Sequence, residues 1–362
     1  MSKIFEKVIR PTLFRMDAER AHELGLKTLE LGLFKAPRFA SEEHVRISEV
    51  FGVVERFGLR FSNPLGIAAG FDKNGVVVNQ LADLGFGFVE VGTVTYEPQP
   101  GNAKPRLFRL PDDRALINRL GFNNDGALKI AERLRNMERN CVVGVNIGRN
   151  KEVANEAAAE NYLKTLEVVH PVADYIAVNV SSPNTPELRD LQSAENLELL
   201  LGSLQQRNSE LGSKPLLVKI APDLDEVDIE AIVDLCLRRE VNGVIATNTT
   251  IAREGLRTNN IEKFGSGGLS GKPLRKRSNE VISQIFRYSN GRLPIIGVGG
   301  VFTAEDAFEK IAAGASLIQA YTGFIYSGPS FAHDIVVGLA NVTRERGFRC
   351  LDDAVGSAVH QQ

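Results

Sequence analysis

Cysteines, long apolar runs and export signals are scarce or absent in this 362-residue chain, and each absence excludes a class of protein. The three cysteines, Cys141, Cys236 and Cys350, lie far apart and form no CxxC or Cys/His pattern. Neither a disulfide framework nor a metal site is therefore expected. No uncharged apolar run reaches the ~18 residues of a membrane-spanning helix, and the N-terminus carries no signal-peptide core. We expect a protein of a reducing intracellular compartment that neither crosses a membrane nor is exported.

An excess of charge of one sign is also missing. The formal net charge is −2 at pH 7, and no basic stripe is interleaved with aromatic residues, so binding to nucleic acid is not expected. Hydrophobic residues make up 43% of the chain, which also contains 33 glycines and 15 prolines. This composition predicts one large core with many tight connections, which fits a single barrel-sized domain with an appendage.

From about Pro64 onward, short apolar runs alternate with longer segments that carry apolar residues at helical spacing. This alternation predicts parallel strands covered by helices. The predicted helices include 76–84, 157–170, 194–211, 226–238 and 304–313. The eight predicted strands, the number that closes a (β/α)8 TIM barrel, are 65–69, 88–92, 142–147, 175–180, 216–220, 244–246, 295–298 and 317–320.

A doubly wound open sheet would alternate in the same way. It usually carries a GxGxxG motif in the turn after its first strand, whereas that turn here reads Ala69-Gly70-Phe71-Asp72-Lys73. The barrel makes a stronger demand, because its sites form at the C-terminal ends of the strands. Polar and glycine residues recur at those ends, although each alone could be a turn or cap residue: Lys73, Thr93, Asn146, Asn179, Ser182, Lys219, Thr247, Asn248, Thr249, Gly299, Gly300, Tyr321 and Thr322.

The segment Asn179-Val180-Ser181-Ser182-Pro183-Asn184-Thr185-Pro186 places amides and hydroxyls directly after an apolar run. An apolar strand followed by a dense polar turn is typical of an active-site rim, and equally of a loop that caps the next helix. Three glycine clusters, 265–271, 297–300 and 320–323, indicate a phosphorylated ligand or cofactor, because loops after the last two barrel strands often bind phosphate through backbone N–H groups. Simple chain turns and a mobile loop are the alternatives.

Five segments resemble, in the correct order, the signature segments of the quinone-dependent, class 2 dihydroorotate dehydrogenases. They are 118–124 (Asn-Arg-Leu-Gly-Phe-Asn-Asn), 179–189, 246–250, 267–271 and 294–300. The resemblance covers most of the chain and implies a (β/α)8 barrel that carries one non-covalent FMN. It further implies oxidation of dihydroorotate to orotate in pyrimidine (UMP) biosynthesis, with reduction of a membrane quinone.

The resemblance also assigns residues. It implies that Ser182 is the base that removes the C5 proton while hydride passes from C6 to the flavin, with Thr185 in the proton relay. Class 1 relatives place cysteine at the base position, and none of the three cysteines stands there. An Asn amide offers both a donor and an acceptor to the substrate ring. The implied substrate-binding residues are Lys73, Asn118, Arg119, Leu120, Gly121, Phe122, Asn179, Asn184, Asn248 and Thr249.

Lys219 is implied as the cation beside the flavin, where negative charge develops on reduction. A lysine inside an apolar strand is costly unless it is paired, so a buried salt bridge is its structural alternative. The residues implied to bind FMN are Ala69, Gly70, Phe71, Asp72, Lys73, Thr93, Asn146, Asn179, Lys219, Thr247, Gly271, Gly300, Tyr321 and Thr322.

Residues 1–40 differ from the barrel that we place at 41–343 and from the polar tail at 344–362. Apolar residues at helical spacing (Ile4, Phe5, Val8, Ile9, Leu13 and Phe14) precede a second helix that we expect to start near Asp17, and Pro11 should break or bend the first. Basic residues outnumber acidic ones, which suits insertion beside anionic head groups: Lys3, Lys7, Arg10, Arg15, Arg20, Lys27, Lys35 and Arg38.

A helical hairpin packed on the barrel bottom is the structural alternative for these 40 residues. The resemblance implies instead a quinone tunnel lined by His22 and Arg109, with a contribution from Tyr321, on the surface of a lipid bilayer. It implies a peripheral protein on the cytoplasmic face of the bacterial inner membrane. The tail, with Asp352, Asp353 and His360, is expected to be poorly ordered.

Two other functions fit parts of the pattern. A Schiff-base aldolase or lyase would use Lys219 as its nucleophile and the glycine loops to hold a substrate phosphate. A catalytically silent, membrane-peripheral binding protein would keep the barrel and lose the chemistry.

Overall fold

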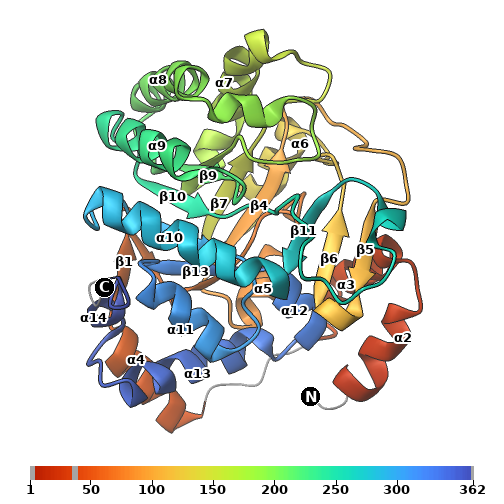
Figure 1. Cartoon of the computed structure of the whole chain (residues 1–362), viewed down its shortest axis with the longest axis vertical. Coiled ribbons are helices and arrows are strands. Elements are labelled where there is room, and N and C mark those ends of the chain that lie inside the picture. Colours follow the sequence, from red (N-terminus) through yellow and green to blue (C-terminus); the bar gives the residue numbers. More distant parts are fainter. Residues whose placement is uncertain (1–4, 35–39, 360–362) are drawn as a thin grey trace.

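Eight buried apolar segments form the parallel strands of a closed barrel (Figure 1). The computed structural model describes residues 5–34 and 40–359, so Lys3, Ile4, Lys35, Arg38 and His360 lie outside the described residues. The order around the barrel, β10-β12-β13-β3-β4-β7-β8-β9, is chain order once the sheet closes, which confirms the predicted (β/α)8 barrel. The strands are β3 (Leu65–Ile67), β4 (Phe88–Val94), β7 (Val142–Ile147), β8 (Tyr175–Asn179), β9 (Leu216–Ile220), β10 (Gly243–Ala246), β12 (Ile295–Val298) and β13 (Leu317–Ala320).

Amphipathic helices surround the barrel. In α9 the side chains of Ile229, Ile232 and Cys236 are buried at helical spacing, and the Asp225 carboxylate caps the helix by accepting from Asp228 N at 2.8 Å. The same pattern of one buried stripe recurs around the ring. The helices are α5 (Val78–Asp83), α6 (Ala127–Arg135), α7 (Ala158–Val169), α8 (Ala194–Glu210), α9 (Glu226–Arg238), α10 (Arg275–Ser289), α11 (Ala304–Ala312), α12 (Thr322–Ser327) and α13 (Phe331–Glu345).

Two antiparallel elements were not predicted. The hairpin of β1 (Val54–Arg56) and β2 (Leu59–Phe61) packs at the start of β4, where the rings of Phe61 and Phe88 lie 5.2 Å apart. The second element is a three-stranded sheet of β5 (Leu107–Leu110), β6 (Ala115–Asn118) and β11 (Gly268–Gly271). Because β6 pairs with β11, Asn118 lies opposite Gly268, so two segments that are distant in sequence form one wall.

The N-terminal segment is helical and lies beside the small sheet (Figure 1). A π-helical turn, η1 (Phe5–Ile9), continues into α2 (Arg10–Phe14), and Pro11 occupies the first turn of α2, where its missing N–H is tolerated. The second helix, α3 (Ala18–Glu30), begins after Asp17 as predicted, and the Asp17 carboxylate caps it. The next helix, α4 (Ser41–Phe51), packs against α13. Within the described residues, no helix combines the length and apolarity needed to cross a bilayer.

The expectation of a poorly ordered tail is wrong for the described residues after Arg344. α14 (Leu351–Ala354) packs against α4, α11 and α13, and Leu351 is only 2% exposed. The backbone N–H groups of Gly356 and Ala358 donate to Ile311 O and Ala312 O at 3.0 and 2.9 Å. The tail is polar in composition, so the burial of its few apolar residues was not predicted from the sequence.

Candidate active site

The C-terminal ends of the barrel strands surround a cavity of about 140 Å³. The loops that follow the strands supply most of its wall, and β6 and β11 close one side. The sequence-predicted residues that line it are Ala69, Gly70, Lys73, Thr93, Asn118, Leu120, Gly121, Phe122, Asn179, Ser182, Asn184, Lys219, Thr247, Asn248, Thr249, Gly271, Gly300, Tyr321 and Thr322. Convergence of polar groups from so many strand ends is the geometry expected of a TIM-barrel site.

Five predicted site residues lie behind the lining instead. The Asp72 carboxylate accepts from Val76 N and Val77 N at 2.9 and 2.8 Å, which fixes the turn after β3. Arg119 donates to Ser266 O at 3.0 Å and stacks over the Phe108 ring, so it holds the glycine-rich segment before β11. Phe71 faces a second cavity, described below. For these three side chains the geometry favours support of the wall over contact with a ligand.

The other two are Asn146 and Thr185. Asn146 is fully buried below the cavity, where its Oδ1 accepts from Thr93 Oγ1 at 2.5 Å and from Asn179 Nδ2 at 3.1 Å. Thr185 is buried close to Ser182 in sequence, and its hydroxyl oxygen has no hydrogen-bond partner within the described part of the chain. A buried hydroxyl without a partner is unusual and marks a place where a bound molecule can complete the hydrogen bonds.

Amide side chains link the strand ends across the cavity. Asn179 Nδ2 donates to Thr93 Oγ1 at 2.9 Å, and Asn179 Oδ1 accepts from Asn248 Nδ2 at 3.3 Å. Asn184 Nδ2 donates to Asn118 Oδ1 at 3.0 Å, while Asn184 Oδ1 is buried with no partner among residues 5–34 and 40–359. The cavity therefore presents acceptors and donors that are held in place before any ligand binds.

Ser182 lines the cavity with its hydroxyl close to the backbone of its own turn. Ser182 Oγ accepts from Asn184 N at 3.3 Å, and the residue is only 5% exposed. Phe122 lines the same cavity with a φ of 54°, a left-handed conformation that is uncommon for a bulky residue.

A buried carboxylate, Glu90 of β4, lies beneath the cavity floor and was missed by the sequence analysis. It is 0% exposed and forms an ion pair with Lys219, with 3.4 Å between Oε1 and Nζ. Tyr175 OH and Gln319 Nε2 donate to Glu90 Oε2 at 3.0 and 2.7 Å, and Asn146 Nδ2 donates to Oε1 at 2.9 Å. An acid within an apolar predicted strand was the available signal.

Lys219 forms the buried salt bridge that was its structural alternative. Its side chain also lines the cavity. Burial and the neighbouring Glu90 carboxylate raise the pKa of Tyr175 well above its ordinary value, so this hydroxyl stays protonated beneath the site.

Lys73 stands between the cavity and the N-terminal helices. Its enclosure lowers the pKa of the ammonium group to about 8, although the nearby Glu19 carboxylate acts in the opposite direction. Glu19 itself is buried in α3 and pairs with Arg106, with 2.7 Å between Oε1 and Nη2. A change of charge on Lys73 therefore falls within an ordinary experimental pH range.

A second cavity of about 290 Å³ lies between the N-terminal helices and the barrel. Its wall is almost entirely apolar, and the predicted quinone-site residues His22 and Arg109 both line it. The third proposed residue, Tyr321, lines the first cavity, and its ring lies 6.0 Å from that of Phe71. Phe71 in turn meets the His22 ring edge-on at 5.1 Å, so one aromatic contact chain connects the two cavities.

The position of these helices answers the hairpin alternative. They contact Phe71, which follows β3, and Phe324, which follows β13, so they lie toward the C-terminal ends of those strands and not on the barrel bottom. Burial lowers the pKa of His22 to about 3, with a further contribution from Lys73, so its imidazole is neutral at pH 7.

Comparisons with known proteins agree with this architecture. The family model described as dihydroorotate dehydrogenase matches residues 53–343. A curated relative from Gloeobacter violaceus, named dihydroorotate dehydrogenase (quinone), is 51% identical over 360 residues, covering 97% of this chain and 98% of its own. A protein of the same name from Christiangramia forsetii is 50% identical over 335 residues, covering 92% and 97%.

A solved structure shares the whole fold. The crystal structure of DHODH from Eimeria tenella in complex with ferulenol superposes with a TM-score of 0.87 at 37% identity, covering 95% of this chain and 96% of that one. The ligand-free structure from the same organism gives a TM-score of 0.86 at 38% identity, covering 94% and 99%. With near-complete coverage in sequence and structure, this chain belongs to the quinone-dependent dihydroorotate dehydrogenase family.

Proposed function

We propose that this protein oxidises (S)-dihydroorotate to orotate in pyrimidine biosynthesis, with one non-covalent FMN as the hydride acceptor and a membrane quinone as the final electron acceptor. The observation that carries the proposal is the single cavity in which Ser182, the asparagine amides, Lys219 and the glycine turns after β12 and β13 converge. Family membership supports the reaction; the individual roles below are proposals.

The wall formed by β12, β13 and β11 fits a flavin phosphate and ring. Gly300 and Gly271 have φ values of 75° and 100°, where an L side chain would be strained, so the backbone can approach a ligand closely. Gln319 lines the same cavity, and its buried Oε1 has no partner within the described residues. Lys219 would place positive charge beside the ring. FMN, when bound, accepts hydride from the substrate and delivers electrons to the quinone.

The asparagines provide the recognition of the substrate ring. Asn118, Asn179, Asn184 and Asn248 present amide groups on three sides of the cavity, and the unpartnered Asn184 Oδ1 can accept from a ring N–H. Lys73 supplies a positive charge for the carboxylate of dihydroorotate while it remains protonated. These contacts would hold the substrate with C5 facing Ser182.

Ser182 Oγ is proposed to take the C5 proton. A serine hydroxyl is a weak base, so its own proton must leave through a hydrogen-bonded relay. Thr185, whose buried hydroxyl lacks a partner in residues 5–34 and 40–359, is the proposed next member of the relay. The Schiff-base alternative would use Lys219 as its nucleophile, whereas the Lys219 side chain is held in an ion pair with Glu90.

The apolar second cavity is proposed as the quinone tunnel. Five large apolar side chains of the N-terminal segment, Val8, Met16, Leu24, Leu31 and Leu33, are exposed, which suits contact with a lipid surface. The described basic residues Lys7, Arg15, Arg20 and Lys27 are also exposed and would face anionic head groups. We therefore propose a peripheral protein on the cytoplasmic face of the bacterial inner membrane.

A three-step flavin spectrum tests the function. The purified protein should show the absorbance of oxidised flavin, lose it on anaerobic addition of dihydroorotate, and regain it after addition of a quinone. Protein without a flavin spectrum, or flavin that dihydroorotate does not bleach, would contradict the dehydrogenase. Bleaching without recovery on addition of a quinone would contradict the quinone step alone.

A further inference from the structure

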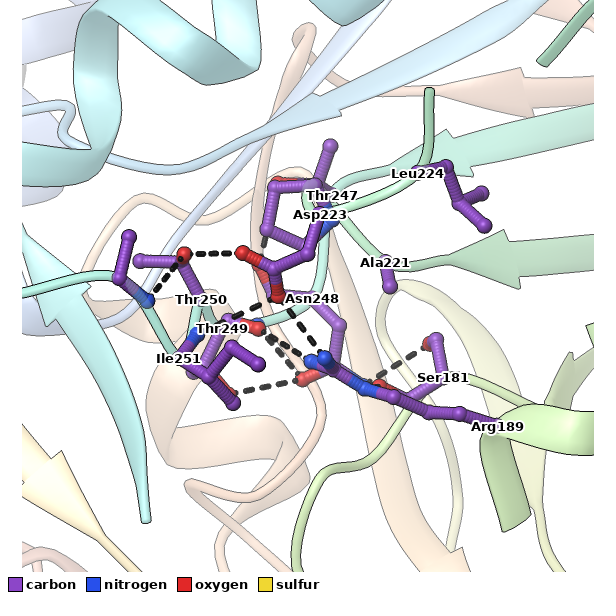
Figure 2. A network of polar contacts seen from close by, with 12 residues as sticks. Ser181, Arg189, Ala221, Asp223, Leu224, Thr247, Asn248, Thr249, Thr250 and Ile251 are labelled. Atoms are coloured by element: carbon purple, nitrogen blue, oxygen red, sulfur yellow. Dashed lines mark hydrogen bonds and ion pairs between the residues drawn. The ribbon is translucent and has the colours of Figure 1, made fainter. Parts of the chain in front are cut away.

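Arg189 lies outside the active-site cavity and yet binds the backbone on two sides of it. It belongs to η5 (Leu188–Gln192), in the connection that follows β8. Its Nε donates to Ser181 O at 3.1 Å, and its Nη2 donates to Thr249 O at 3.0 Å. Ser181 directly precedes Ser182, while Thr249 itself lines the cavity. One guanidinium therefore joins the serine turn to the facing wall of the substrate site (Figure 2).

The third partner of the Arg189 guanidinium is Asp223, in the loop after β9. Arg189 Nη1 lies 2.8 Å from Asp223 Oδ2, and the two side chains are only 22% and 20% exposed. Asp223 also accepts from Thr250 Oγ1 and, at 3.2 Å, from Ile251 N, which tie it to the loop after β10 (Figure 2). The ion pair thus holds together the loops that follow three successive strands, β8, β9 and β10.

Separate sets of contacts hold the far half and the beginning of the serine loop. Arg149 Nη2 donates to Pro186 O at 2.6 Å, Asn102 Nδ2 to Asn184 O at 3.0 Å, and Asn155 Nδ2 to Glu187 O at 2.9 Å. None of these three bonds involves Ser181 or Ser182. Two links join the beginning of the loop to the Asn248–Thr249 wall: Asn248 Nδ2 donates to Ser181 Oγ at 3.0 Å, and the Arg189 guanidinium connects Ser181 O with Thr249 O. The guanidinium is the link that also forms the ion pair with Asp223.

We propose that Arg189, braced by Asp223, is a positioning residue that sets the distance between Ser182 and the Asn248–Thr249 wall against which the substrate lies. This inference rests on the proposed function, because it assumes that Ser182 removes the C5 proton. Proton transfer needs contact at about hydrogen-bond distance, and a misplacement of about 1 Å can cost on the order of 100-fold in rate. Arginine suits the position because three different nitrogens of its rigid planar fork reach three separated acceptors, whereas the three donors of lysine all lie on one nitrogen.

Arg189→Lys is the diagnostic variant, since it keeps the positive charge and removes the fork. Asp223→Asn is the second variant, because it keeps the shape of the brace and removes its charge. Arg207→Lys is the matched control: Arg207 also serves two partners, Glu167 and Glu210, but on the exposed surface of α8. For each protein we would measure flavin content, thermal midpoint, orotate affinity, and the anaerobic rate of flavin bleaching by dihydroorotate.

The decisive readout is the kinetic isotope effect with dihydroorotate deuterated at C5. In Arg189→Lys we expect saturated bleaching to slow by roughly 10- to 100-fold, with a larger C5 isotope effect because proton removal has become more limiting. Flavin content and thermal midpoint should stay close to those of the unmodified protein. Asp223→Asn should change in the same direction by less, and Arg207→Lys should not change.

Two results would overturn the positioning role. One is an Arg189→Lys protein with unchanged saturated rate and isotope effect. The other is a rate loss that follows flavin loss or unfolding, with no change in isotope effect; Asp223→Asn decides the matter in the same way if Arg189→Lys does not fold. If the unmodified protein itself is not bleached by dihydroorotate, the proposed function fails and the inference fails with it. Normal bleaching in both proteins removes only the inference.

Discussion

The two cavities differ in the polarity of their walls. The barrel-end cavity is walled by amides, hydroxyls and glycine turns at the strand ends, and beneath it both carboxylate oxygens of Glu90 accept hydrogen bonds. The cavity under the N-terminal helices is apolar, with His22 and Arg109 as its main polar members. The first cavity is suited to orienting a polar ring through hydrogen bonds, whereas the second is suited to an apolar molecule that needs few hydrogen bonds.

Ser182→Ala should produce the largest effect, confined to the polar cavity. Removing the proton acceptor should slow flavin bleaching by dihydroorotate by about 10²- to 10⁴-fold, the range typical of a general base. Bound flavin and orotate affinity should persist, because the variant removes only a hydroxyl from the wall. Stopped-flow absorbance measures the bleaching. A variant that turns over at the normal rate would remove Ser182 from the mechanism.

Glu90→Gln should show how much the ion pair between Glu90 and Lys219 contributes to stability. The substitution leaves the Lys219 ammonium buried without its anion, which typically costs about 3–5 kcal/mol of unfolding free energy. Urea unfolding measures the loss. A double variant with Lys219→Met should recover part of it, because the isolated charge is then removed. Strictly additive costs in that cycle would show that the ion pair is not the source.

Removal of residues 1–40 should affect the apolar cavity alone. Quinone reduction should fall by at least about 10-fold, since these residues form most of the quinone wall. Bleaching by dihydroorotate should be retained, because no residue before Ala68 lines the polar cavity. Co-sedimentation with anionic vesicles should be lost as well. Equal quinone turnover in the shortened protein would contradict the tunnel.

The smallest expected effect is that of pH, which should change ligand binding in the polar cavity but not in the apolar one. Lys73, with a pKa lowered to about 8, is protonated below that pH and neutral above it. Orotate affinity should therefore fall several-fold as the pH rises through 8, and Lys73→Arg should flatten this dependence because arginine stays charged.

The matching measurement in the apolar cavity uses His22. Its pKa is lowered to about 3, so it is neutral from pH 5 upward. His22→Asn should leave the pH profile of quinone reduction unchanged between pH 5 and 8. A step near pH 6.5 that disappears in the variant would show that the imidazole titrates and would contradict its buried, neutral state.

The barrel could be predicted because its signals are local. Each strand is a short run of mainly buried apolar residues, and the bounds of β7, β9, β12 and β13 match those read from the sequence. The candidate site could be predicted because its residues lie at the C-terminal ends of these strands. Most residues assigned by resemblance line one cavity. Its individual contacts were out of reach, since Asn146 and Asp72 turn away from that cavity.

What could not be predicted depends on pairing between distant segments. Strands β6 and β11 have four residues each and find one another across about 150 positions, as the Asn118–Gly268 register shows. The partners of Arg189 lie on two other loops, although Arg189 itself stands in a segment that the sequence had already singled out. Neither secondary-structure propensity nor residue spacing predicts these contacts, because the distant segments meet only when the barrel closes.

The aromatic partition formed by Phe71 and Tyr321 has a kinetic consequence. Phe71 lines one cavity and Tyr321 the other, so under the proposed function the pyrimidine acid and the lipid-soluble oxidant would occupy separate volumes. Each would then leave or arrive without displacing the other, and electrons would cross between the cavities. An inhibitor of one cavity and an inhibitor of the other should therefore bind at the same time. Each should inhibit the enzyme independently of the other.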